Sequence, residues 1–206
     1  MTTLLTRPAV RTWTVALRLL LLTTAATIVY TLVVTLVGQV ALHRQANGSL
    51  ITSGGTVIGS SLIGQSFTDG NGDALPQWFQ SRPSAAGDGY DAKSSGGSNL
   101  GPNSAELRRT IEQRRAAYLR LNGAGSVPAD AVTASASGLD PHISVENALR
   151  QADRVASTRG IPASTVRALV ARSEQAPDLG FLGASTVDVL QLNAALAAAD
   201  PSGSGR

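Results

Sequence analysis

The chain has 206 residues, of which 43% are hydrophobic and only 15% are charged, and it contains no cysteine. This length suits one domain of ordinary size with an appendage. The lack of cysteine excludes a disulfide framework, a cysteine-ligated metal site and a thiol nucleophile. The formal net charge of +3 would point to nucleic acid only if basic residues formed a stripe along the folded body.

The excess positive charge lies at the N-terminus. Arg7, Arg11 and Arg18 come before any acidic residue, and the first acidic residue is Asp69. Beyond Arg18 the acidic and basic residues balance. The five arginines between residues 108 and 120 share a predicted helix with Glu106 and Glu112, and such mixed charge is typical of a solvated helix face. The pattern therefore predicts no nucleic-acid partner.

Residues 19–42 carry no ionisable group except Tyr30. As a helix they would span about 36 Å, enough to cross a hydrocarbon core of about 30 Å. A signal peptide is the alternative interpretation, but this apolar run is longer than the usual signal core and no clear cleavage site follows it. The sequence therefore predicts an uncleaved membrane anchor.

The arginines also predict the orientation of that anchor. Positive residues cluster on the cytoplasmic side of membrane helices, so residues 1–18 are expected in the cytoplasm. The rest of the chain after the helix is then extracytoplasmic. We expect a single-pass protein of the cell membrane with this topology.

After the predicted membrane helix, the sequence predicts a linker at 43–55, one extracytoplasmic domain at 56–199 and a disordered tail at 200–206. Two short apolar runs bounded by glycine, 56–58 and 61–63, predict strands or a hairpin. Residues 84–103 form a long loop rich in glycine, serine and asparagine.

The second half of the domain predicts four helices. Asn103 is expected to cap a helix that ends at Asn122, and Ser144 to cap one that runs to Arg159. Two more are expected at about 162–173 and 186–198. The fold class is therefore α+β: one N-terminal transmembrane helix, then a domain with a small sheet and several helices.

Three chemical hypotheses find weak support. Residues 96–101 have the glycine spacing of a phosphate-binding loop, but the required lysine does not follow, and Lys93 is the only lysine. The alternation of Asp69, Asn71 and Asp73 suggests a calcium loop, yet alanine and glutamine stand where that loop needs glycine and glutamate. A plain surface turn is the preferred interpretation, and we predict no metal site.

A serine hydrolase is the third hypothesis. His142 follows Asp140 and Pro141, with several serines nearby. The proline between carboxylate and imidazole favours a turn over an aligned triad, and no nucleophile elbow occurs. We therefore expect no catalytic residue.

Several loop segments taken in order are more specific than any single motif. Behind one membrane helix come Gly59–Gln65 (GSSLIGQ), Phe79–Ala85 (FQSRPSA), Ser95–Asn103 (SGGSNLGPN) and Ser137–Ser144 (SGLDPHIS). In this order they closely resemble the C subunit of the bacterial Kdp potassium-transporting P-type ATPase, the KdpC family. The resemblance runs from the helix to about residue 196.

The resemblance implies a non-catalytic subunit of an ATP-driven, high-affinity potassium uptake complex, needed for assembly. Its implied partners are a channel-like potassium-binding subunit and an ATP-hydrolysing P-type subunit. ATP and potassium would belong to the complex, and the chain would have no cofactor of its own. The family is described as a catalytic chaperone that raises the ATP affinity of the hydrolysing subunit.

The resemblance also marks two groups of residues. Any contact with nucleotide would fall on the loop formed by Ser95, Gly96, Gly97, Ser98 and Asn99. The loops expected to serve structure or partner contact contain Arg82, Pro83, Asp140, Pro141 and His142. The alternative function is a membrane-anchored extracytoplasmic binding or hydrolase domain that acts alone.

Overall fold

The computed structural model describes residues 6–205, and the side chains of residues 11–203. Residues 1–5 of the predicted cytoplasmic tail, and residue 206, lie outside the described residues. The chain forms two compact units, Met1–Ser49 and Leu50–Arg206. Each unit is described by itself below.

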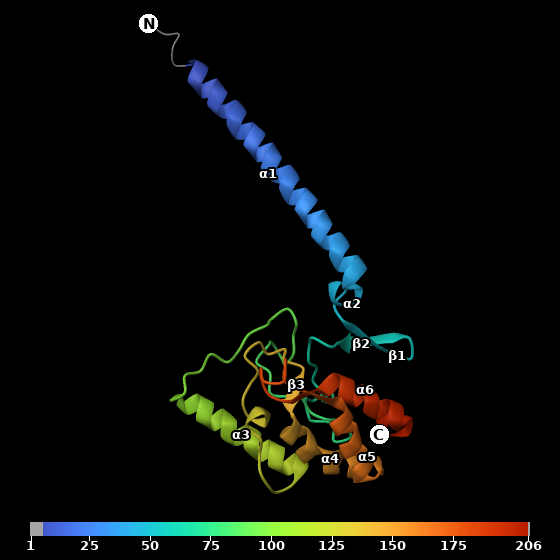
Figure 1. Ribbon diagram of the computed structural model, residues 1–206. Coiled ribbons are helices and arrows are strands. Elements are labelled where there is room, and N and C mark those ends of the chain that lie inside the picture. The colour runs from blue at the N-terminus through green and yellow to red at the C-terminus, as the bar shows by residue number, and fades with distance from the viewer. Residues whose placement is uncertain (1–5, 206) are drawn as a thin grey trace. The chain divides into compact units, whose positions relative to one another are not determined.

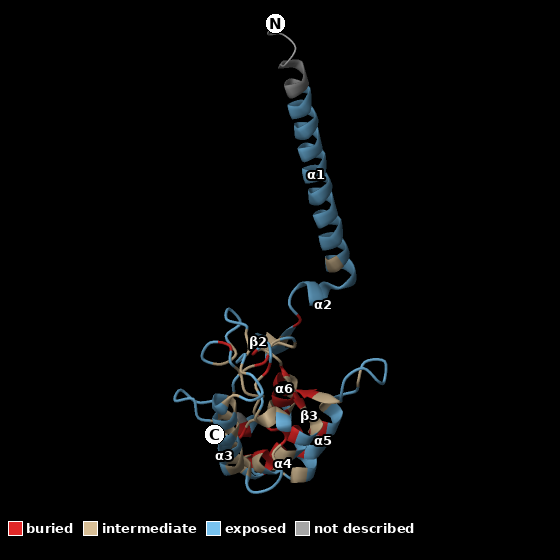
Figure 2. Cartoon of the chain, turned by 90° about the vertical axis from the view of Figure 1, so that its left-hand side faces the viewer, coloured by how far each residue is buried: buried red, intermediate tan, exposed pale blue. Residues whose placement is uncertain are grey.

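The first unit is dominated by one long helix, α1 (Thr6–Ala41), followed by the short α2 (His43–Ala46) (Figure 1). Its apolar side chains are exposed along the whole described length (Figure 2). The hydroxyls of Thr23, Thr27 and Thr31 donate to backbone carbonyls one turn earlier, so these polar groups are satisfied within the helix. Within the described residues, Arg11–Ala41 is the one helix long and apolar enough to cross a membrane. The helix thus extends further toward the N-terminus than the predicted 19–42, and this extension contains Arg11 and Arg18.

The second unit begins with a hairpin of β1 (Leu50–Ser53) and β2 (Thr56–Ser60). Gly54 and Gly55 form its turn, and both have positive φ angles of 56° and 81°, which glycine adopts at little cost. The predicted partner run 61–63 is wrong, since it makes only an isolated bridge between Ser60 and Ile63. The partner of β2 lies upstream, because the two glycines at 54–55 supply the tight turn that residues 59–61 lack.

The main sheet has three short strands: β3 (His142–Ser144), β4 (Glu174–Gln175) and β5 (Thr186–Asp188). All pairings are antiparallel, in the order β3-β5-β4. The helices α4 (Val145–Arg159), α5 (Ala163–Ser173) and α6 (Val189–Ala199) pack beside it and supply most of the core. The mixed α+β class with a small sheet is confirmed.

Local signals predicted the helix ends well. The Ser144 hydroxyl accepts the N–H of Asn147 at the start of α4, and Gly160 ends that helix in the left-handed conformation. The helix α3 (Ala105–Asn122) is capped by Ser104, so the predicted cap at Asn103 is off by one residue. The predicted helix at 186–198 starts three residues later, because Thr186–Asp188 pair with β3 instead.

The remaining elements are two 3₁₀ helices, η1 (Ala129–Ala131) and η2 (Pro201–Gly205). The prediction of a disordered tail at 200–206 is wrong for residues 200–205. Asp200 pairs with the buried guanidinium of Arg159 at 3.4 Å and accepts bonds from Ser202 and Gly203. A buried charge needs a partner, so this ion pair holds the tail to α4.

Candidate functional site: the loop junction around Asp140

The carboxylate of Asp140 lies where three loop segments meet. Its Oδ2 atom accepts a hydrogen bond from Nη1 of Arg82 at 3.0 Å. Its Oδ1 atom accepts the backbone N–H of His142 at 3.0 Å and lies 3.3 Å from Nδ1 of the same residue. About a quarter of the Arg82 side chain and about a third of the Asp140 and His142 side chains are exposed. The structure thus brings together Arg82, Asp140 and His142, which the sequence had marked in separate loops.

The charges of this cluster support one another. The hydrogen bond with His142 is the main cause that lowers the pKa of Asp140, helped by Arg82. The same bond raises the pKa of His142 against the opposing effect of burial, and Asp188 adds to the rise. The ionised carboxylate and the protonated imidazole are therefore favoured together.

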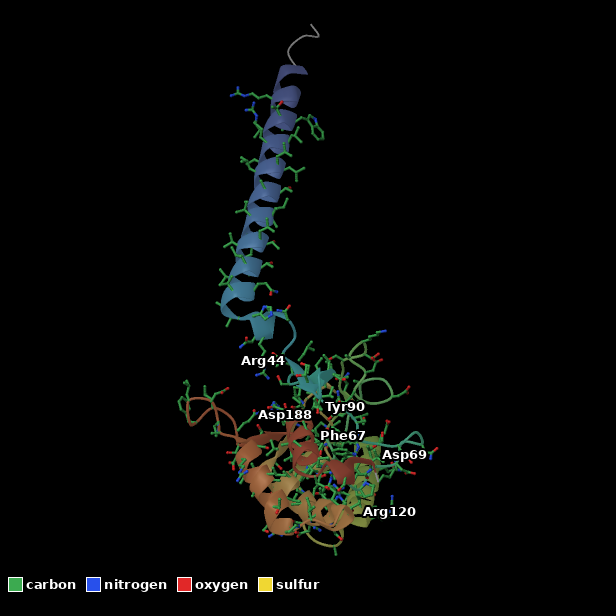
Figure 3. The ribbon with its side chains drawn as sticks, turned by 90° about the vertical axis from the view of Figure 1, so that its right-hand side faces the viewer. Arg44, Phe67, Asp69, Tyr90, Arg120 and Asp188 are labelled. Carbon is green, nitrogen blue, oxygen red and sulfur yellow. The ribbon has the colours of Figure 1, made fainter. Side chains whose placement is uncertain are left out.

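Tyr90 closes the cluster on its other side. Its hydroxyl donates to the carbonyl of Arg82 at 2.9 Å, and burial raises its pKa to about 12. Gly64 lies against the Tyr90 ring, where a Cβ would come within 2.4 Å, and its N–H donates to the carbonyl of Leu139. In Figure 3 the labels of Tyr90 and Phe67 lie close together on the domain, and Arg120 of α3 lies at a distance from both.

Hydrogen bonds to backbone groups join the 82–90 loop to the 135–140 loop. The Ser84 hydroxyl donates to the carbonyl of Gly138 at 2.7 Å and accepts the N–H groups of Ala86 and Tyr90. The N–H of Ser135 donates to the carbonyl of Pro83. We call these two loops, together with Ser95–Asn99, the loop junction.

The Ser95–Asn99 segment packs on the same loop. The N–H of Gly96 and the hydroxyl of Ser95 both donate to the carbonyl of Ser137, at 2.9 and 3.0 Å. A Cβ on Gly97 would lie 2.8 Å from the carbonyl of Ala136, so only glycine allows this close approach. A phosphate-binding loop turns its N–H groups toward the ligand, whereas the Gly96 N–H is used by the protein itself.

The domain has two open cavities, of which the first borders the loop junction. One of about 250 Å³ is lined by Arg82, Tyr90 and Ser81, among others. Another of about 450 Å³ lies beside α3 and is lined by Arg114, Tyr118 and Asp73. Arg114 is committed to the carbonyl of Val132 at 3.1 Å.

The turn at 69–73 is closed by the carboxylate of its first residue, Asp69. Asp69 accepts the N–H groups of Asn71 and Asp73, both at 2.9 Å, and these bonds lower its pKa. Across the described part of the chain, no three histidine or acidic side chains group as metal ligands would. The preferred interpretation as a plain turn matches this geometry.

The hydroxyls near His142 serve the loops. Those of Ser135 and Ser137 lie 3.2 Å apart and bond to each other, and Ser135 also accepts the N–H of Asp140. The Ser144 hydroxyl donates to Asp130. A hydrolase would need a serine beyond the imidazole, aligned with the carboxylate, so this arrangement fits a structural junction better.

Sequence reasoning missed a set of buried amides that hold the segment before Arg82. Asn193 of α6 accepts the N–H of Phe79 at 2.9 Å and donates to its carbonyl at 3.0 Å. Gln151 of α4 makes the same double contact with Gln80, at 2.7 and 3.1 Å. Two side chains thus replace a neighbouring strand. The available signal was an amide placed among the apolar positions of each helix.

Arg154 of α4 completes this clamp. Its guanidinium donates to the carbonyls of Pro76 and Trp78 and to the Gln151 side chain. Burial lowers its pKa to about 10. The segment 76–80 is therefore held by α4 and α6, and this places Arg82, two residues further on, within hydrogen-bond distance of Asp140.

Together these features define a class: a membrane-associated protein with one N-terminal apolar helix and one small α+β domain whose loops are tied into a junction. The model of the KdpC family, "K+-transporting ATPase, c chain", matches residues 13–198. The match includes both the helix and the domain.

Curated relatives agree with the family model. A potassium-transporting ATPase KdpC subunit of Kineococcus radiotolerans is 50% identical over 187 residues, covering 90% of this chain and 92% of its own. One from Caulobacter vibrioides is 51% identical over 173 residues, covering 84% and 85%. One from Mycobacterium tuberculosis is 50% identical over 185 residues, covering 88% and 95%. The chain therefore belongs to the KdpC family, whose members are subunits of the potassium-transporting ATPase.

Proposed function

We propose that this chain is a non-catalytic, single-pass subunit that holds a potassium-transporting ATPase complex together. Its partners in this proposal are a channel-like potassium-binding subunit and an ATP-hydrolysing P-type subunit. The observation that carries the proposal is the family match over residues 13–198, since it includes the membrane helix and the domain in one unit.

The loop junction supports the non-catalytic part. Nη1 of Arg82 binds Asp140, and the Ser84 hydroxyl binds the carbonyl of Gly138, so both side chains join the 82–90 loop to the 135–140 loop. An enzyme keeps reactive groups directed at a substrate position. The junction therefore serves to hold a surface in shape, and Pro83, Pro141 and His142 belong to that structural role.

The helix α1 supports attachment within the membrane. Its leucine and valine side chains are exposed in the isolated chain, and its threonine hydroxyls are satisfied internally. Lipid or neighbouring membrane helices must therefore cover it. The three N-terminal arginines favour the cytoplasm for the N-terminus, which gives the domain an extracytoplasmic position.

The relation to ATP follows from that topology. We propose that any effect on the ATP affinity of the hydrolysing subunit passes through contact between subunits. An extracytoplasmic Ser95–Asn99 loop has no access to cytoplasmic ATP, and its Gly96 N–H is already bonded to Ser137. ATP and potassium then remain ligands of the complex.

Co-purification tests the assembly role. The chain is co-expressed with the other subunits in two versions: one lacks residues 19–42, and the other carries an alternating leucine–alanine helix of equal length there. Loss of co-purification in the first version is expected because the anchor is gone. The second version tests whether the native helix surface is needed. Normal co-purification and potassium transport with the helix deleted would contradict the proposal.

A photoreactive ATP analogue tests the nucleotide part. Irradiation of the purified complex should label the ATP-hydrolysing subunit and leave peptide 94–104 of this chain unmodified. Labelling of Ser95–Asn99 that excess ATP prevents would show direct nucleotide contact and would overturn this part of the proposal.

A further inference from the structure

One exposed apolar segment of the domain takes no part in the loop junction. It lies between β4 and β5, where Leu179 is 82% exposed, Phe181 73% and Leu182 52%. In Figure 3 this stretch is the orange loop that extends away from the helices. We call residues 179–182 the apolar tip. Large apolar side chains gathered at an exposed loop mark an interaction site more often than scattered ones do.

The backbone of the tip is held in one shape. The N–H of Leu182 donates to the carbonyl of Asp178 at 2.9 Å, and the N–H of Asp178 donates back to the carbonyl of Leu182 at 3.1 Å. Leu179 has a φ of 54°, a region that a large side chain rarely adopts. A turn closed in this way has less backbone entropy to lose on binding than an open loop has.

The charge around the tip selects between two occupants, a lipid surface and a protein. Glu174 and Asp178, both exposed, precede the tip in the chain, and no basic residue lies between Arg172 and Arg206. The other two acidic residues of this stretch, Asp188 and Asp200, are buried. Loops and helices that enter a membrane interface carry lysine or arginine for anionic lipid headgroups. The two exposed carboxylates next to the tip in the chain therefore favour a protein pocket with basic or hydrogen-bond-donating groups at its rim.

We propose that the apolar tip is a docking knob, which inserts Phe181 and Leu182 into an apolar, basic-rimmed pocket on another subunit of the potassium-transporting complex. This inference rests on the proposed function, because it requires that the chain assemble with other subunits. It adds a specific contact of the domain to the attachment made by the membrane helix. Aromatic side chains that enter pockets contribute a large share of interface affinity.

Site-specific photocrosslinking tests the identity of the occupant. A benzoylphenylalanine replaces Phe181 in the full chain within the purified complex, and the matched control replaces Leu62, which is 62% exposed elsewhere in the same domain. A crosslink from position 181 to another subunit is expected. Crosslinks from 181 to lipid alone, or no crosslink in the assembled complex, would overturn the inference.

Substitution tests the energetic contribution. The double variant Phe181→Ser, Leu182→Ser should leave the detergent-solubilised complex about tenfold faster than the unmodified chain, since loss of an anchor acts mainly on dissociation. The control Leu62→Ser should leave at the original rate. Both tip side chains are exposed, so the unfolding midpoint should not change and misfolding can be recognised separately. An unchanged release rate with an unchanged midpoint would contradict the docking knob.

Charge reversal separates the pocket from a membrane. The variant Glu174→Lys, Asp178→Lys should also speed release if the pocket rim is basic. If the chain instead binds vesicles containing phosphatidylglycerol more tightly and stays in the complex as before, the tip contacts lipid and the inference fails. The helix deletion could abolish co-purification while every tip variant behaves like the unmodified chain. That result would leave the proposed function intact and would refute only the contact made by the tip.

Discussion

Asp140 shows how one carboxylate can organise loops that are far apart in the chain. One oxygen accepts from a guanidinium 58 residues away, and the other contacts the backbone N–H and Nδ1 of His142, two residues away. Each partner is charged or polarised, so these bonds are stronger than neutral ones. The side chains are partly exposed, and solvent reduces the strength of their Coulomb attraction.

The raised pKa of His142 predicts a pH-dependent stability. A raised folded-state pKa gives stabilisation that is complete below the unfolded value of about 6.5 and is lost as the pH rises through the folded value. The free energy of unfolding should therefore fall as the pH rises above about 6.5. The pKa of Asp140 is lowered on folding, so its effect on stability runs in the opposite direction. Its contribution to the free energy of unfolding is present above about pH 4 and is lost on further acidification.

The measurement compares the unmodified chain with His142→Gln in detergent. Denaturant unfolding is followed by the fluorescence of Trp78 in a Trp13→Phe background. The variant should show a flatter profile between pH 6 and pH 8. Equal slopes for both proteins would contradict the assignment of His142.

Asn193 makes a second prediction at the residue scale. Asn193→Ala removes both hydrogen bonds to the Phe79 backbone and leaves a buried N–H and C=O unpaired. We expect a loss of about 3 kcal/mol in the free energy of unfolding, from denaturant titration. Gln113→Ala, at an exposed position of α3, serves as the control and should change stability by less than about 0.5 kcal/mol. A similar effect of both substitutions would refute the clamp.

At the scale of elements, the loops of this domain carry the structural role that a longer sheet carries elsewhere. The main sheet pairs at most three residues per strand. Between β2 and α3 the chain makes only isolated bridges. This long stretch is instead tied down by Gln151, Asn193 and the loop junction.

Gly138 tests whether the loop junction depends on close backbone approach. Its φ is 70°, and a Cβ there would lie 2.7 Å from the Cβ of Ala86 and 2.8 Å from the carbonyl of Gly96. Gly138→Ala should therefore lower the free energy of unfolding by about 2–4 kcal/mol. Gly101→Ala, in open space on a neighbouring loop, is the control and should be close to neutral. The result is read from denaturant unfolding, and equal midpoints for both variants would contradict the packing described.

At the scale of the whole molecule, the distribution of charge separates the membrane anchor from the domain. All of the net charge lies in residues 1–18, before the uncharged run at 19–42, while the rest of the chain is formally neutral. This distribution bears on orientation in the membrane and gives no reason to expect a polyanion as a partner.

Membrane topology can be measured cleanly because the chain has no cysteine. A membrane-impermeant maleimide should label Ser126→Cys, at an exposed loop position, in intact cells. It should label Thr2→Cys only after the cells are lysed. The reverse pattern would place the domain in the cytoplasm and would overturn the orientation and the nucleotide proposal together.

Features of the fold that depend on near neighbours were predictable. The cap at Ser144 and the stop at Gly160 involve residues within a few positions, so the sequence pattern indicates them directly. The N-cap of α3 at Ser104 was predicted with an error of one residue for the same reason. The strand β1 was missed because its partner choice depends on the turn at Gly54 and Gly55.

The residues of the candidate site were predictable from the sequence, but the contacts between them were not. Arg82, Asp140 and His142 were marked as separate loop residues, but nothing local shows that Arg82 reaches Asp140. The clamps of Asn193 on Phe79 and of Gln151 on Gln80 join residues 114 and 71 positions apart. An amide on a helix face has many possible partners, and only packing selects one of them.

The sequence by itself determined the apolar helix, the neutral body, the main helices and the family resemblance, because composition, periodicity and ordered motifs are properties of the chain alone. Tertiary structure decided which loops meet at Asp140, that residues 200–205 fold back onto Arg159, and that the Phe181 side chain stays uncovered. These outcomes follow from contacts between distant residues, whose free energy depends on burial and geometry that no local pattern contains.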